Sequence, residues 1–337
     1  MKLKMLFAGL VATGLVQAQD ITLKFQHIWP GAGANSAQVV EPWCKKVAAD
    51  SNNRIKCQLF PSMSAGGTPP QLVDRVKDGV DDLVMTLPSY TAGRFPSLEV
   101  FELPFMTNSA EGAAKALWAY ASKNSMKEFP GTKVLALWVH DEGYIHTNGK
   151  AVKTMADMKG LKIRTPHRQA LKLMNALGAS GVGMPPTAVQ DAISKGTVDG
   201  AVFPWEGAVD FRVSDVAKFT TETPATRPAM YTGVFAFLMN QAKYDALPAD
   251  LKAIIDRHSG AQLSAAMGKR WDESLAPAKK AALSKGTQVT VLTEAETDAW
   301  IKASAGSYDE WVADMNKRGA NGAALLQEAR DLIKKNK

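Results

Sequence analysis

The sequence predicts an α/β protein of two lobes, and three observations support that fold class. Strand-like and helix-like segments alternate along the chain, as they do where helices cover a sheet. The alternation pauses after residue 140 and restarts near residue 161. Without its first 18 residues, the chain of 337 residues still exceeds the size at which one hydrophobic core usually stops growing.

The first lobe is expected from apolar runs typical of strands and from helical spacing between them. Apolar residues alternate in ITLKFQHIW, and helical spacing follows after a Gly/Ala/Asn turn. The expected elements are strands at 21–29, 55–60, 82–87 and 133–140 and helices at 36–50, 71–79 and 110–127. This order predicts a largely parallel sheet.

The second lobe repeats the pattern, and later elements are expected to cross back between lobes. The expected elements are strands at 161–166 and 198–205, a helix at 168–177, a central strand within 229–240 and mostly helix over 249–284. Pro277 is expected to kink or break that last helical stretch. We assign 19–142 with about 231–270 to lobe I, 143–230 with about 271–325 to lobe II, and a helical tail to 337.

The first 18 residues are typical of an export signal. Lys2 and Lys4 precede an apolar run over 5–16, and small residues follow at 16 and 18. This run is too short to span a bilayer, and no later stretch reaches the roughly 20 apolar residues that a span needs. We expect cleavage after Ala18 and a periplasmic protein.

Cysteine content and charge narrow the class further. Cys44 and Cys57 either form a disulfide in an oxidising compartment or remain two buried thiols. The net charge of +7 is spread along the chain without a long basic run. This pattern favours a solvated basic surface over nucleic-acid binding, although it suits anionic ligands.

The chain shows no recognisable catalytic or metal constellation. The segment around Ser180 lacks the nucleophile-elbow spacing, and the histidines, including His140 and His146, form no zinc motif. GAGANS, residues 31–36, lacks the last glycine of a dinucleotide fingerprint, so we expect a tight turn with Asn35 or Ser36 as helix cap. We expect no enzyme, cofactor or metal.

Four segments carry a resemblance to a known family. They are RFPSLEVFELPFM (94–106), ADMKGLKIRTP (156–166), NALGASGVGMP (175–185) and AVQDAISKGTVDG (188–200). In this order and spacing they resemble the DctP-type solute-binding subunit of tripartite ATP-independent periplasmic (TRAP) transporters, over nearly the whole mature chain. The resemblance implies two lobes around a cleft, hinge strands shared by both lobes and a long helix across them.

The resemblance also assigns a ligand anchor. In that family the arginine of the KGLK-x-R segment pairs with the ligand's carboxylate, and Arg164 occupies this position. A guanidinium suits the role because its planar fork matches two carboxylate oxygens and keeps its charge. From the residues alone, a structural ion pair with a nearby Asp or Glu is the alternative.

Departures from sialic-acid-binding relatives point to an apolar pocket. Tyr144 stands where those relatives carry a second arginine, and Phe203, followed by Pro204 and Trp205, stands where they carry an asparagine. We expect a monocarboxylate with an aromatic or branched body, such as a 2-oxo or 2-hydroxy acid. Core packing is the alternative for Phe203 and Trp205. Some relatives bind a 2-oxo acid through a metal ion held by a carboxylate beside a tryptophan. This chain has Val202 and Phe203 at the corresponding positions, so we expect no metal there.

Further candidate contacts follow from position. Ser89, Tyr90 and Trp29 follow predicted strands at the carboxyl ends, where open α/β sheets bind ligands. Arg168 lies one helical turn after Arg164 and offers a second cation. Rim packing or solvent exposure is the alternative for each.

The family implies a capture-and-delivery function. The expected partners are a small carboxylate and the small and large TRAP membrane subunits, and we expect a monomer. A periplasmic receptor for signalling and a periplasmic hydrolase of an anionic substrate are the alternatives.

Overall fold

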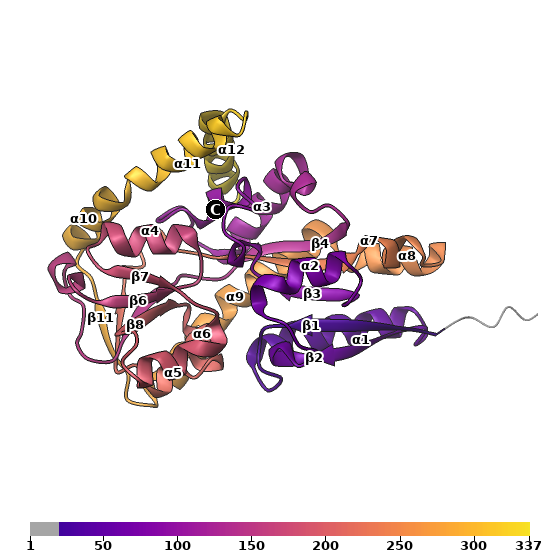
Figure 1. Cartoon of the computed structure of the whole chain (residues 1–337), viewed down its shortest axis with the longest axis horizontal. Coiled ribbons are helices and arrows are strands. Elements are labelled where there is room, and N and C mark those ends of the chain that lie inside the picture. The colour runs from indigo at the N-terminus through magenta and orange to yellow at the C-terminus, as the bar shows by residue number, and fades with distance from the viewer. Residues whose placement is uncertain (1–19) are drawn as a thin grey trace, which may run out of the picture.

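The computed structural model describes residues 20–337, so the expected signal segment and its cleavage after Ala18 lie outside the described residues. Within residues 20–337 the strands form two separate sheets, each covered by helices (Figure 1). The predicted α/β fold with two lobes is confirmed. No helix in this part of the chain is both long and apolar enough to cross a membrane.

The lobe I sheet has the order β2-β1-β3-β10-β4. Its strands are β1 (Ile21–His27), β2 (Ile55–Phe60), β3 (Leu83–Thr86), β4 (Thr132–Val139) and β10 (Val234–Asn240). β1 pairs in parallel with β2 and β3, whereas β10 runs antiparallel between β3 and β4. All seven residues of β10 are buried, which explains its continuous apolar sequence.

The lobe II sheet has the order β11-β9-β5-β8-β6-β7. Its strands are β5 (Tyr144–Thr147), β6 (Lys162–Thr165), β7 (Ser180–Gly183), β8 (Gly200–Phe203), β9 (Phe219–Glu222) and β11 (Gln288–Val291). Four of these, β5, β7, β9 and β11, were not predicted, whereas β6 and β8, which are equally short, lie within predicted strands.

Helices cover both sheets. They are α1 (Glu41–Asp50), α2 (Leu72–Lys77), α3 (Ala110–Asn124), α4 (Arg168–Ala176), α5 (Val189–Ser194), α6 (Trp205–Asp210), α7 (Gln241–Asp245), α8 (Ala249–Arg257), α9 (Gly260–Leu283), α10 (Glu294–Ser304), α11 (Gly306–Lys317) and α12 (Gly322–Lys335). α2, α3 and α4 match their predicted ranges within a few residues, and α8 and α9 fill the stretch predicted to be mostly helical.

The lobes are joined by loops and by one long helix. The chain crosses at 140–143, between β4 and β5, and at 223–233, between β9 and β10. The two sheets share no strand in residues 20–337, so the expected shared hinge strands are replaced by these loops. The long helix α9 contacts α3 and β4 of lobe I and α6 of lobe II.

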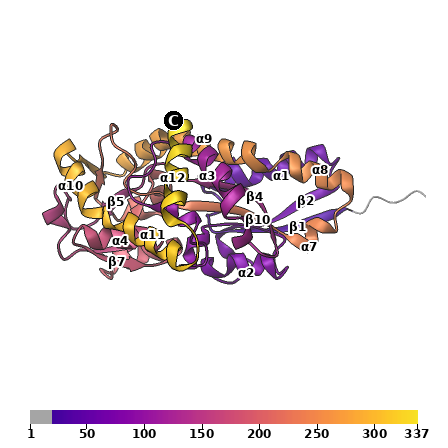
Figure 2. The same ribbon diagram turned by 90° about the horizontal axis from the view of Figure 1, so that it is seen from above.

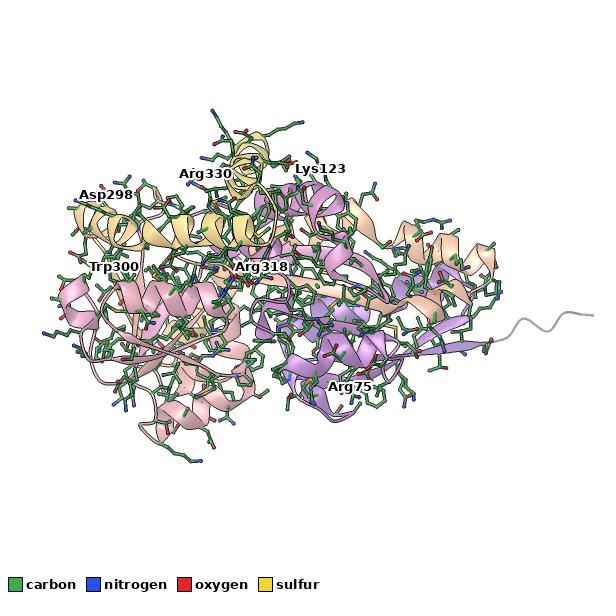
Figure 3. The ribbon with its side chains drawn as sticks, turned by 45° about the horizontal axis from the view of Figure 1, so that its top comes forward. Arg75, Lys123, Asp298, Trp300, Arg318 and Arg330 are labelled. Carbon is green, nitrogen blue, oxygen red and sulfur yellow. A yellow bond between two sulfur atoms is a disulfide. The ribbon has the colours of Figure 1, made fainter. Side chains whose placement is uncertain are left out.

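The C-terminal part of the chain contains the long helix α9 and a helical tail. α9 continues through the exposed Pro277, so the helical stretch is not broken there. Beyond it, α10 and α11 pack on α4 of lobe II, and α12 returns to α3 of lobe I (Figure 2). The fully buried Trp300 fixes α10 to the core of lobe II (Figure 3).

Cys44 of α1 and Cys57 of β2 form a disulfide in the structure, 13 residues apart. A bridge that closes a loop of this size stabilises a protein by about 3 kcal/mol in the chain-entropy account. Cys44→Ser with Cys57→Ser is therefore expected to lower the free energy of unfolding by roughly 2–3 kcal/mol. Urea titration with and without dithiothreitol measures this, and an unchanged midpoint on reduction would contradict it.

Candidate functional site

A small cavity lies between the two lobes, with about 40 Å³ open to the centre of a water-sized sphere. Its lining side chains are mostly apolar or aromatic: Ile28, Trp29, Leu87, Tyr90, His140, Arg164, Pro166, Pro186, Phe203, Pro204, Gly207, Phe211, Tyr231, Phe235 and Trp271.

The strand order explains why these side chains meet. Trp29, Tyr90 and His140 follow the carboxyl ends of β1, β3 and β4 in lobe I, and Arg164 and Phe203 lie at the ends of β6 and β8 in lobe II. The two sheets thus present their carboxyl edges to one cavity, which is where open α/β sheets bind ligands.

Arg164 is a buried cation without an acidic partner. Its side chain is 1 % exposed. Nε donates to the carbonyl oxygen of Met184 at 2.9 Å and Nη1 donates to that of Val202 at 3.4 Å, while Nη2 bonds to nothing in the described part of the chain. The guanidinium lies 4.4 Å from the centre of the Phe203 ring. Burial lowers the pKa of Arg164 from its ordinary value.

A buried charge of this kind is costly unless something pairs with it. The structural ion pair that was the alternative for Arg164 is not formed, because no ion pair within residues 20–337 includes it. The contact with the Phe203 ring does not neutralise the guanidinium, and its Nη2 is unbonded in the described part of the chain. The group can therefore pair with an anion.

Two tyrosines border Arg164. Tyr90 and Tyr231 both line the cavity and are close enough to influence the pKa of Arg164. Burial raises the pKa of Tyr90 to about 12 and also raises that of Tyr231. Both phenols therefore keep their protons and can donate hydrogen bonds to an anion held by Arg164.

Of the eight predicted ligand contacts, the cavity brings together four: Arg164, Phe203, Tyr90 and Trp29. Tyr144 and Trp205 do not line it. They pack against each other with ring centres 5.7 Å apart, and the Trp205 indole nitrogen donates to Glu222 at 2.8 Å. The position of Trp205 fits the core-packing alternative given for it, and Tyr144 is buried beside it.

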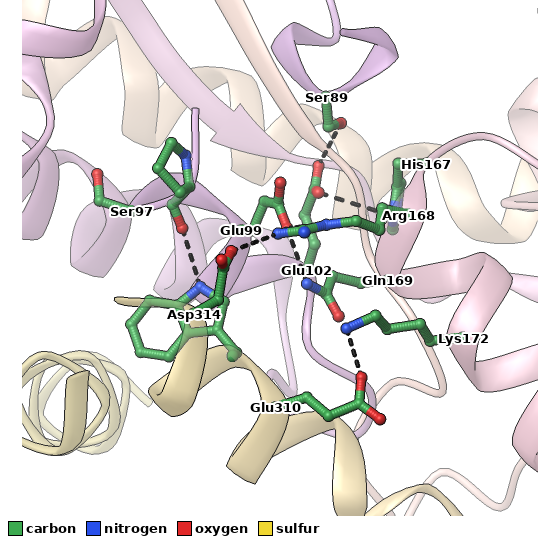
Figure 4. A network of polar contacts seen from close by, with 12 residues as sticks. Ser89, Ser97, Glu99, Glu102, His167, Arg168, Gln169, Lys172, Glu310 and Asp314 are labelled. Carbon is green, nitrogen blue, oxygen red and sulfur yellow. Dashed lines mark hydrogen bonds and ion pairs between the residues drawn. The ribbon is translucent and has the colours of Figure 1, made fainter. Parts of the chain in front are cut away.

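Ser89 and Arg168 also lie outside the cavity lining. The Ser89 hydroxyl donates to Glu102 at 2.7 Å. Arg168 donates to Glu99 at 2.6 Å and to Asp314 at 3.1 Å, so it ties α4 of lobe II to lobe I and to α11 (Figure 4). Its charge is already paired within the protein.

Several lining residues escaped the sequence-based prediction: His140, Phe211, Tyr231, Phe235 and Trp271. Tyr231 and Phe235 lie within the predicted central strand region, and nothing in an apolar run marks which members face a ligand. Trp271 comes from α9, whose helical pattern does not reveal that the helix passes behind the cavity.

The family model for bacterial extracellular solute-binding proteins, family 7, matches residues 25–314. The chain belongs to this family, the DctP family. This match confirms the resemblance stated above. Proteins of this family serve transport and are not an enzyme class.

Solved structures of TRAP solute-binding proteins are similar over the whole fold. One from Rhodoferax ferrireducens, in complex with copurified benzoate, is 43 % identical with a TM-score of 0.92, covering 94 % of this chain and 98 % of that one. One from a marine metagenome, described as specific for aromatic acid ligands, is 42 % identical with a TM-score of 0.92, covering 94 % and 99 %.

A third, from Bordetella bronchiseptica, contains (R)- and (S)-mandelate. It is 27 % identical with a TM-score of 0.86 and covers 94 % of this chain and all of its own. All three are TRAP solute-binding proteins with small carboxylates bound.

A set of hydrogen bonds closes one side of this solute-binding protein over the cavity, and we call it the interlobe latch. The Asn35 amide of lobe I donates to Glu206 on α6 of lobe II, and the Ala34 backbone N–H donates to Asp210 at 3.2 Å. Arg270 of α9 donates to Glu206 at 2.6 Å. Burial raises the pKa of Glu206, although Arg270 opposes this shift.

Asn35, one of the two residues predicted as helix cap, stands at the N-cap position. Its side chain makes no capping hydrogen bond to the helical segment that begins at Ser36. The amide reaches Glu206 instead, because this charge-assisted hydrogen bond to a buried carboxylate is stronger than a cap on a short turn. The Ser36 hydroxyl donates to the Pro30 carbonyl at 2.6 Å.

Gly143, in the crossing between β4 and β5, makes room for Tyr231. A Cβ atom at Gly143 would lie 1.9 Å from Cε1 of the Tyr231 ring. Gly143→Ala is therefore expected to displace this cavity-lining ring and to weaken ligand binding at least tenfold, with a stability loss of about 1–3 kcal/mol.

Calorimetric titration with a bound acid measures the affinity of the Gly143→Ala variant. Gly149→Ala is the matched control, because nothing lies within 4 Å of a Cβ atom there. Equal affinities for the two variants would contradict the expectation.

Proposed function

We propose that this protein captures an aromatic monocarboxylate between its lobes, 2-oxo and 2-hydroxy acids included, and delivers it as a monomer to the small and large subunits of a TRAP transporter. The observation that carries the proposal is Arg164: a buried guanidinium with a free Nη2, facing an aromatic cavity and lacking an acidic partner. The ligand's carboxylate supplies the missing charge.

The charge of the cavity favours one carboxylate over two. Among the lining residues of the described chain, Arg164 is the only Lys, Arg, Asp or Glu. A second carboxylate on the ligand would be buried without a cationic partner, which costs several kcal/mol. Compact dicarboxylates are therefore poor candidates.

The wall of the cavity favours an aromatic body. Rings surround the space, and several stack on one another, such as Phe235 on Trp271 with centres 5.7 Å apart. Burial contributes about 25 cal/mol per Å² of apolar surface, and ring packing adds to this. A sugar acid carries more hydroxyl groups than the few polar side chains of the lining, Tyr90, His140 and Tyr231 beside Arg164, can pair. The benzoate, aromatic acid and mandelate bound by similar proteins support the same class.

The experiment is a thermal-shift and calorimetric titration of the mature protein with matched ligands. Benzoate, mandelate and phenylpyruvate are expected to raise the melting midpoint, because a ligand that binds only the folded state stabilises it by mass action. Benzamide has the same ring without the charge and is expected to give no shift. Succinate and galactonate test the other acid classes.

Binding of benzamide as tightly as benzoate would remove Arg164 as the anchor. Binding of succinate or galactonate alone would overturn the proposed ligand class while leaving the family unchanged.

A further inference from the structure

His140 is a buried residue that lines the cavity. It follows β4 at the lobe I end of the 140–143 crossing and is 3 % exposed. Its ring packs against Tyr231, with centres 5.2 Å apart, and lies 6.1 Å from Phe235 and 6.0 Å from Trp271. All four side chains line the cavity.

The contacts of His140 determine which nitrogen carries the proton. Nδ1 lies 2.6 Å from the carbonyl oxygen of Asp141, which can only accept, so Nδ1 must donate. Burial lowers the pKa of His140 to about 4, so the ring is neutral near pH 7. Nε2 then has a lone pair and no proton, and it bonds to no residue in the described part of the chain.

The other buried histidines differ from His140 in place or in bonding. In the described part of the chain His27 also has a nitrogen without a partner, Nδ1, but it does not line the cavity. His146 uses both ring nitrogens, on the Thr220 hydroxyl at 2.9 Å and the Phe203 carbonyl at 3.1 Å. His167 also uses both, since Nε2 contacts the Thr232 carbonyl at 3.0 Å and Nδ1 accepts from the Ala170 N–H at 3.2 Å. Neither lines the interlobe cavity.

We infer that Nε2 of His140 accepts a hydrogen bond from a hydroxyl group of the bound acid, so that the site prefers hydroxylated aromatic acids to unsubstituted ones. This inference rests on the proposed function and adds a specificity-determining residue to it.

The chemistry of Nε2 excludes other ligand groups. A carboxylate carries only acceptors and would be repelled by the lone pair, so it belongs at Arg164. An ammonium group would need an acidic partner, and the cavity lining offers none in residues 20–337. A neutral hydroxyl satisfies Nε2 without bringing charge into the cavity.

The two contacts also come from different lobes. Arg164 belongs to lobe II and His140 to lobe I, so one ligand that reaches both is held fully only when the lobes are closed. A contact made only in the closed form shifts the population toward that form. The hydroxyl therefore contributes to closure as well as to recognition.

The test compares the affinities of benzoates that carry a hydrogen, a hydroxyl or a fluorine at the same ring position. Calorimetric titration of the full mature protein uses benzoate, its three hydroxy isomers and the matching fluorobenzoates, which are similar in size but cannot donate. At least one hydroxy isomer is expected to bind wild type roughly 3- to 10-fold tighter than benzoate and its fluoro analogue, as a neutral buried hydrogen bond provides.

His140→Phe removes the acceptor and keeps a ring, and it is expected to reduce this preference to about onefold. His140→Gln offers an amide oxygen near the position of Nε2 and is expected to restore part of it. Melting curves without ligand report whether each variant folds, and the ratio of affinities within one variant is insensitive to a general loss of binding.

Two results would overturn the inference alone: wild type that binds benzoate at least as tightly as every hydroxy isomer, or a hydroxyl preference that survives in His140→Phe. Failure of wild type to bind any of these acids would overturn the proposed ligand class, and the inference with it.

Discussion

Arg164→Ala is expected to weaken binding of the carboxylate ligand by roughly 2–5 kcal/mol, about thirtyfold to several thousandfold. The physical reason is that the ligand's carboxylate, once desolvated between the lobes, loses its only cationic partner among the lining residues of the described chain. Arg164→Lys keeps the charge but loses the planar fork, so an intermediate loss is expected. Calorimetric titration with benzoate measures both.

The stability of the ligand-free variants separates binding from folding. Because Arg164 has no acidic partner among residues 20–337, replacing it with methionine is expected to leave the unfolding free energy unchanged or raise it. Arg257→Ala removes the same charge from an exposed surface pair with Asp50 and should leave affinity unchanged. A large stability loss in Arg164→Met would instead indicate a structural role.

Asn35→Ala is expected to weaken ligand binding by roughly ten- to a hundredfold without touching the cavity. The Asn35 amide bonds to the buried carboxylate of Glu206 across the lobes, and a hydrogen bond to a charged group contributes about 1.5–3 kcal/mol. Its loss lowers the population of the closed form, and apparent affinity falls in proportion.

The dissociation rate and the closed fraction test this mechanism. Stopped-flow measurements are expected to show faster ligand release, and small-angle scattering should show a larger radius of gyration at the same ligand saturation. Gln241→Ala is the control, because its side-chain amide bonds only to Asp245 within lobe I. Unchanged release from Asn35→Ala would mean that the latch does not hold the closed form.

The local pattern of the chain was enough to predict the fold class, the family and the strand on which the proposed anchor lies. The strand predicted at 55–60 is β2 residue for residue, and the apolar run at 229–240 contains the fully buried central strand β10. Arg164 was placed correctly at a strand end because the periodicity of β6 and the following Thr165-Pro166 are local features. Such local features predict a strand however the rest of the chain packs, as long as the same face of the strand is buried.

Only the tertiary structure decided which aromatic side chains face the ligand cavity. Trp205 was favoured from its place after Phe203, yet it is buried against Tyr144, while Trp271 from the distant helix α9 lines the cavity instead. The same holds for His140, whose free nitrogen follows from one carbonyl contact. Sequence periodicity indicates which face of an element is buried, but the neighbour that buries it depends on how two lobes pack, and that is a property of contacts far apart in the chain.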